Sequence, residues 1–183
     1  MNPVKPTSYR LISVFVCDEP RIMTKLTSLL QRRGFVVEGI SAGKTKENEL
    51  LRLTIRVRGD DQRLEQIRKQ LYKLVETVRV AFINPRHHVQ REMALIKIRC
   101  SADDRAEMIR KSAAHNGRII DVGPQWLIVE MTSEPRDIDS FIARIPPDSI
   151  GEIARSGIVA MNAASRQPES AKQSSAKRTI QET

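Results

Sequence analysis

The sequence predicts an α+β protein made of two small domains, each with the order strand, helix, strand, strand, helix, strand (βαββαβ). Three observations support this prediction. The 183 residues suffice for two small domains. The two halves show the same order of apolar strands and amphipathic helices, and a polar stretch containing proline separates them at 84–88. The βαββαβ order is that of ferredoxin-like domains.

The first half begins with a strand that is apolar on both faces and ends at Val16. A helix is expected from Arg21 to Arg33, and Gly34 stands just past it, where a left-handed residue terminates helices. A second strand over 35–41 and an exposed polar turn over 43–49 follow. The apolar stripe that predicts the helix consists of Ile22, Leu26, Leu29 and Leu30.

Residues 50–58 alternate between apolar and polar side chains, which predicts a half-buried strand. The apolar set is Leu51, Leu53, Ile55 and Val57, and the polar set is Arg52, Thr54, Arg56 and Arg58. Gly59, Asp60 and Asp61 end this strand and cap the next helix. The stripe of that helix is Leu64, Ile67, Leu71, Leu74 and Val75. A strand over 78–83 closes the half.

The second half repeats the pattern less clearly. Strands are expected over 89–100, 118–122, 125–131 and 149–155. One helix is expected to end near Gly117 and a second to cover 136–145, and a short apolar piece follows at 158–161. The helix before Gly117 is the least defined, because its apolar face is mostly alanine and methionine. The expected domains are therefore 8–83 and 89–162, joined by a linker at 84–88. The polar tail at 163–183 is expected to be disordered.

The composition restricts the class of protein. The net charge of +9 comes from 31 basic and 22 acidic residues, but the two signs are interleaved, as on a solvated helix face. No apolar run has the length of a membrane span or a signal peptide, so a cytoplasmic location is expected. Cys17 and Cys100 are expected to be plain thiols. Small sheets with open edges commonly pair with a second copy, so we expect a homodimer.

Few residues are candidates for chemistry. His87, His88 and His115 have no neighbours at metal-ligand spacing, and no phosphate loop or nucleophile elbow is present. The arginines at 52, 56 and 58 share a strand face, but the strand carries no aromatic residue to stack on RNA bases, which favours a solvated or protein-contacting face. The loop from Cys17 to Arg21 is the remaining candidate. It is either a plain connection or an effector pocket, formed at a helix start against strand 35–41 of a dimer partner.

An ordered set of short stretches resembles the small, regulatory subunit of acetohydroxyacid synthase (acetolactate synthase). These stretches are 13–14, 31–35, 53–55, 64–67 with 69–71 and 73–75, 91–92 with 95–98, 117–122 and 154–157. The resemblance implies an N-terminal ACT domain, a C-terminal ferredoxin-like domain and a dimer. It also implies a chain that has no catalysis and no cofactor of its own.

The partner implied by the resemblance is a large catalytic subunit that uses thiamine diphosphate, FAD and Mg²⁺. That enzyme condenses pyruvate with pyruvate or 2-oxobutyrate, at the committed step toward valine, leucine and isoleucine. The small subunit activates it and confers feedback inhibition, usually by valine. The alternative is a stand-alone ACT-domain protein that binds amino acids and regulates another enzyme or transcription. A nucleic-acid-binding module, based only on the charge and the arginine face, is not favoured.

The departures from the family pattern fall in the expected effector site. The family has Asn-Glu-x-Gly after the first strand, where this chain has Asp18, Glu19, Pro20 and Arg21. It has an asparagine that bonds the amino acid at the position of Val36. Weakened or altered valine sensing is therefore expected. The candidate effector residues are Asp18, Glu19, Pro20, Arg21, Ile22, Val36 and Val37.

Overall fold

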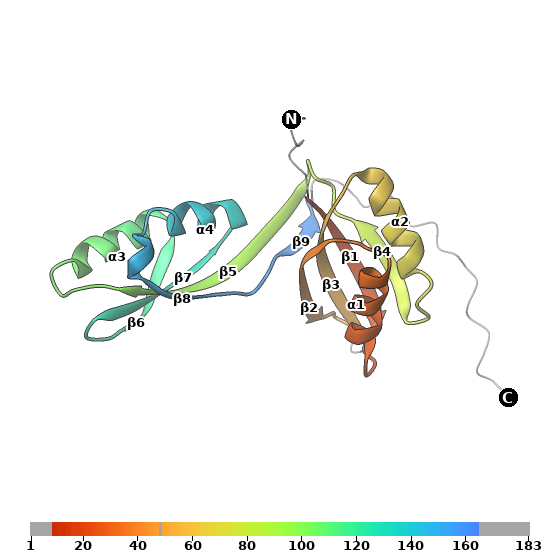
Figure 1. Ribbon diagram of the computed structural model, residues 1–183, viewed down its shortest axis with the longest axis horizontal. Helices are drawn as coiled ribbons and strands as arrows, with labels where there is room; N and C mark the ends of the chain where they lie inside the picture. The colour runs from red at the N-terminus through yellow and green to blue at the C-terminus, as the bar shows by residue number, and fades with distance from the viewer. Residues whose placement is uncertain (1–8, 48, 165–183) are drawn as a thin grey trace.

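The structure, a computed structural model, describes residues 9–47 and 49–164 (Figure 1). Two βαββαβ units follow each other along the long axis of the molecule, each with its helices on one face of an antiparallel sheet; the first sheet has four strands, and the second has four strands plus β9. The predicted α+β class and the repeated element order are confirmed. Most of the tail expected to be disordered lies outside the described residues, as does residue 8 at the predicted start of the first domain.

The first unit has the sheet order β2-β3-β1-β4. Its helices, α1 and α2, pack on the face that carries the even-numbered residues of β1, among them Ile12 and Val14. Gly34 ends α1 with a φ of 65°, and Asp60 caps α2 by accepting a 2.9 Å hydrogen bond from the backbone N–H of Arg63, as the sequence predicts. The elements are β1 (Tyr9–Cys17), α1 (Ile22–Arg32), β2 (Val37–Lys44), β3 (Leu50–Arg58), α2 (Asp61–Leu71) and β4 (Thr77–Phe82).

Two predictions for this unit are wrong in detail. The stripe of α2 was expected to continue through Leu74 and Val75, but the helix ends at Leu71. The chain then turns through bonds between residues three apart, such as Leu74 N to Leu71 O at 3.1 Å, and Val75 is 94% exposed. The turn is needed because β4 must start at Thr77. The second strand begins and ends later than expected, because pairing with β3 extends it to Lys44.

The second unit repeats this topology with the order β6-β7-β5-β8. Its core includes Ile96, Val129 and Phe141, which lie between the sheet and α4. Helix α3 buries only Ser112, whose hydroxyl donates to the Met108 carbonyl, which fits the weak helix signal there. The elements are β5 (His88–Arg99), α3 (Arg105–Ala114), β6 (Gly117–Val122), β7 (Trp126–Ser133), α4 (Pro135–Ile142), a 3-10 turn (Pro147–Ser149) and β8 (Ile150–Arg155).

A last strand, β9 (Val159–Asn162), joins the two units. It pairs with the first residues of β5, His88–Arg91, and runs back beside the first unit (Figure 1). Ile158 and Ala160 form a small third core with Leu11 and Ile83. Leu11 alternates with the core residue Ile12 along β1, so β9 packs on the face of the first sheet that has no helices.

Candidate effector site

The loop after β1 makes a tight, hydrogen-bonded turn into α1. The backbone N–H of Asp18 donates to the Glu49 carbonyl at 2.8 Å, and that of Glu19 donates to the Cys17 carbonyl at 2.9 Å. The loop residues Asp18, Glu19, Pro20 and Arg21 are exposed, whereas Ile22 is buried in the core of the unit. A ligand in this loop would therefore contact backbone groups and exposed side chains, whereas Ile22 faces the core.

Arg21 occupies a backbone conformation that favours glycine. It precedes α1 with φ 71° and ψ 3°, in the left-handed region, and its side chain makes no capping hydrogen bond to the helix. This region costs a residue with a Cβ about 1–2 kcal/mol. The resemblance places a glycine at this position, and the φ angle supports that correspondence: the turn has kept the shape although the glycine is absent.

Val36 and Val37 lie far from this loop within one chain. Val36 is 53% exposed and its carbonyl accepts a 3.0 Å bond from the Arg58 N–H, while Val37 is half-buried opposite Val57. Strands β1 and β2 are parallel to each other, because both run antiparallel to β3. The loop follows the end of β1 and Val36 precedes the start of β2, so the two places are separated by about 16 Å, the length of the 11-residue helix α1.

One chain therefore holds two halves of the predicted effector site, at opposite ends of its sheet. They can meet only between two copies, as the dimer hypothesis requires. Strand β2 is an edge of its sheet, and no other strand of residues 9–47 and 49–164 pairs along its outer side.

A depression of about 500 Å³ lies on the outer side of α1, next to the loop. It is lined mainly by polar and basic side chains, among them Arg21, Lys25 and Arg32. The Lys25 ammonium donates to the Glu76 carboxylate, and this bond raises the pKa of Lys25 and lowers that of Glu76. Leu74 is the one aliphatic residue in the lining, so the depression does not offer the apolar wall that a valine side chain needs.

The arginine face of β3 is used for contacts within the chain. Arg56 and Arg58 both reach the Glu38 carboxylate, at 2.9 and 2.7 Å, and the Arg56 guanidinium lies 4.0 Å from the centre of the Tyr9 ring. Arg52 donates to the Ser13 hydroxyl at 3.0 Å and to the Ala160 carbonyl. These contacts occupy the arginines within the chain, so contact of this face with another protein stays a prediction.

The aromatic residues of this face were not predicted from the sequence. Phe15 lies directly opposite Arg52 across the β1–β3 pair, and Arg79 from β4 stacks 4.0 Å from the centre of the Phe15 ring. The sequence of β3 alone could not indicate these aromatic residues, because they belong to the neighbouring strand β1. The strand register, once known, is the signal that brings them together.

The remaining candidate groups form no site. In the two described ranges, no group of three or more His, Cys, Asp or Glu is placed to hold a metal ion. Cys17 and Cys100 are free, and burial and the nearby Asp104 raise the pKa of the Cys100 thiol. Of the helices that the structure describes, none is long and apolar enough to cross a membrane.

Comparison with known families assigns both units. A family model described as "AHAS small subunit-like ACT domain" matches residues 12–79. A second, described as "Small subunit of acetolactate synthase", matches residues 91–164. Together they cover most of the two βαββαβ units and all of β9, in the order expected from the sequence.

Individual relatives of the chain agree with the family that these models indicate. The probable acetolactate synthase small subunit of Methanothermobacter thermautotrophicus is 38% identical over 167 residues, which are 91% of this chain and 99% of that protein. The acetolactate synthase isozyme 3 small subunit of Escherichia coli is 36% identical over 154 residues, 84% of this chain and 94% of its own. The crystal structure of the acetolactate synthase small subunit from Thermotoga maritima superposes with a TM-score of 0.81 at 43% identity, covering 85% of this chain and 97% of that chain. The chain belongs to the acetolactate synthase small subunit family.

Proposed function

We propose that this chain is a non-catalytic regulatory subunit that binds and activates the acetolactate synthase catalytic subunit in branched-chain amino acid biosynthesis. The observation that carries the proposal is the extent of the match: 91% of this chain aligns with 99% of a small subunit. A stand-alone ACT-domain regulator would need to match only residues 12–79, whereas here the second unit matches the same family as well.

We also propose that the chain works as a homodimer joined along β2. The strand is a sheet edge, and its pairing with a second copy would extend the sheet and bring the loop of one copy toward Val36 of the other. This arrangement alone would complete the effector site, since the two halves are separated within one chain.

Valine sensing by this site is proposed to be weak or altered. The Arg21 side chain projects from the position where the family pattern has a glycine that lets the ligand approach the backbone. The Val36 side chain has no amide group, so it cannot hydrogen-bond the ammonium or carboxylate of an amino acid. Asp18 remains to hold an ammonium group and the Arg21 guanidinium remains to hold a carboxylate, so a different amino acid stays a possible effector.

Co-elution with the catalytic subunit of the same organism tests the function. Size-exclusion chromatography with light scattering is expected to give a dimer of this chain alone and a larger complex with the catalytic subunit. Acetolactate formation by that complex should exceed that of the catalytic subunit alone. Separate elution of the two proteins at micromolar concentrations would contradict the proposal.

Titration calorimetry with valine tests the sensing. The double variant Arg21→Gly with Val36→Asn is expected to gain valine affinity relative to the parent chain. A matched control is Asn116→Gly with Val78→Asn. Asn116 is the other described non-glycine residue with a positive φ, 57°, and Val78 is 54% exposed, like Val36. Micromolar valine binding by the parent chain would refute the claim of a weakened site.

A further inference from the structure

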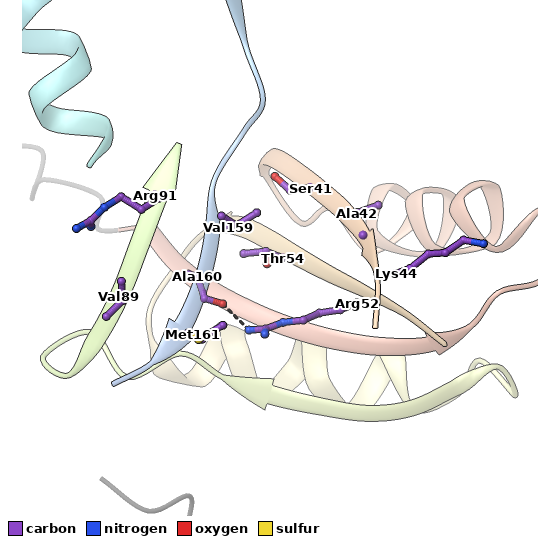
Figure 2. Close-up of a pocket in the computed structure, with 11 residues that line it drawn as sticks. Ser41, Ala42, Lys44, Arg52, Thr54, Val89, Arg91, Val159, Ala160 and Met161 are labelled. Carbon is purple, nitrogen blue, oxygen red and sulfur yellow. Dashed lines mark hydrogen bonds between the residues drawn. The ribbon is translucent and has the colours of Figure 1, made fainter. Parts of the chain in front are cut away.

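A cavity of about 390 Å³ lies where β9 crosses the first sheet (Figure 2). Its walls come from β2, β3, β5 and β9, so both units contribute to it. The volume lies in the range of about 300–1,000 Å³ found for small-molecule sites, which are mostly apolar with a few placed polar groups. The apolar part of the lining consists of Ala42, Gly43, Val89, Val159, Ala160 and Met161.

Arg52 supplies the charge in this cavity. Figure 2 shows its side chain extending from β3 toward β9, where it donates to the Ala160 carbonyl. Its Nε donates to Ser13 at 3.0 Å, so two of its five N–H groups are used by these bonds. Burial and the neighbouring Arg79 lower the pKa of Arg52, although a guanidinium remains charged.

In the part of the chain that the structure describes, the charge of Arg52 has no counter-ion. Among the ion pairs of residues 9–47 and 49–164, none involves Arg52 or Arg79. Lys44 and Arg91 also line the cavity, but Figure 2 shows their charged ends pointing away from β9. The cavity therefore presents one cationic group, the Ser41 and Thr54 hydroxyls and an apolar wall, with no carboxylate in its lining.

We propose that this cavity binds a small aliphatic monocarboxylate that carries no ammonium group, such as a branched-chain 2-oxo acid. The carboxylate would pair with the free N–H groups of Arg52, and the aliphatic body would pack on Val159 and Met161. An α-amino acid fits less well, because its ammonium would enter a cationic lining that offers no carboxylate to pair with it. The site is separate from the loop and from Val36.

Binding can be measured on the chain alone, so its failure would leave the proposed role with a catalytic subunit intact. The probe is 3-methyl-2-oxobutanoate, with valine as its amino analogue. Titration calorimetry or ligand-detected NMR should show binding of the oxo acid at sub-millimolar concentration and at least about tenfold weaker binding of valine.

Two glycines of β2 make a matched pair for locating the site. A Cβ at Gly43, which lines the cavity, or at Gly39, which does not, would meet nothing within 4 Å, and neither residue has a positive φ. Gly43→Val should therefore fold and weaken oxo-acid binding at least about tenfold, while Gly39→Val should stay within about twofold of the parent. Arg52→Met should also lose binding, whereas Arg58→Met, which removes an arginine paired with Glu38, should not.

Three results would overturn the proposal. The first is no oxo-acid binding by the parent chain at millimolar concentration, as when a second copy fills the cavity. The second is oxo-acid binding that Gly43→Val and Arg52→Met leave unchanged. The third is valine binding that equals oxo-acid binding and is lost in Gly43→Val. Thermal unfolding of each variant confirms that a loss of binding is not a loss of fold.

Discussion

The ion pair between Arg155 of β8 and Glu92 of β5 offers a stringent test of the second unit. The Glu92 side chain is only 7% exposed, and its carboxylate accepts a 2.5 Å bond from Arg155. Arg155 also reaches Asp139 of α4 at 2.6 Å, so one guanidinium ties two strands and a helix together. Glu92 is the main cause of the raised pKa of Arg155. The pair also joins two of the stretches that resemble the family, 91–92 and 154–157.

Arg155→Met would leave the Glu92 carboxylate nearly buried with no partner. Such a loss costs about 3–5 kcal/mol for a fully buried pair. Arg155 is 31% exposed, which lets water reach part of the site, so we expect about 2–3 kcal/mol here. Adding Glu92→Gln removes the buried charge and should recover about half of that loss, so the double variant should lose about 1–1.5 kcal/mol.

Urea unfolding followed by tryptophan fluorescence measures this energy directly. The chain has one tryptophan, Trp126 in β7, so the signal reports on the second unit. Arg136→Met is the control, because Arg136 is 80% exposed and pairs with Glu134 at 2.9 Å on the surface; it should change stability by less than about 0.5 kcal/mol. A loss in Arg155→Met no larger than that of the control would refute the reasoning.

Three further predictions concern the first unit and the thiols. Arg21→Gly should stabilise the chain by about 0.5 kcal/mol, since relief of the left-handed strain exceeds the entropy cost of glycine; a lower urea midpoint would contradict this. Iodoacetamide at pH 8 should label Cys17 faster than Cys100, because Cys100 is buried and its pKa is raised; mass spectrometry showing the reverse order would exclude it. Because pairing lowers the pKa of Glu76 and raises that of Lys25, the pair should stabilise the fold between the unfolded-state values of 4.5 and 10.5. The melting-temperature difference between the parent and Glu76→Gln should therefore be constant from pH 6 to 9. It should shrink as the pH falls through the lowered pKa of Glu76 or rises through the raised pKa of Lys25. A difference that grows in acid would disprove the pairing.

The local elements could be predicted because each follows from a short-range pattern. The alternation over 50–58 specifies β3, and Gly34 and Asp60 mark helix ends through their own backbone and side-chain chemistry. The same reasoning failed at Leu74 and Val75. Their spacing fits a helix, but the need to start β4 at Thr77 overrides it.

Longer-range features were out of reach of these patterns. The third core joins Leu11 to Ile158 and Ala160, and the cavity joins β2 to β9, across more than 100 positions of sequence. The hydrophobic periodicity of the sequence is a local signal and does not indicate which distant segments pack together. The loop Cys17–Arg21 was a candidate because it lies at a helix start, whereas Val36 entered the site through the resemblance. Periodicity alone could not group Arg21 with Val36, because they lie at opposite ends of one sheet.

Activation of a catalytic subunit is the central property that we propose for this chain. The most direct measurement is the rate of acetolactate formation by a fixed amount of that subunit as the chain is added. We expect the rate to rise and to saturate at a fixed ratio of the two proteins, with little response to added valine. A rate that stays flat at every concentration of the chain, under conditions where both proteins are folded, would contradict it.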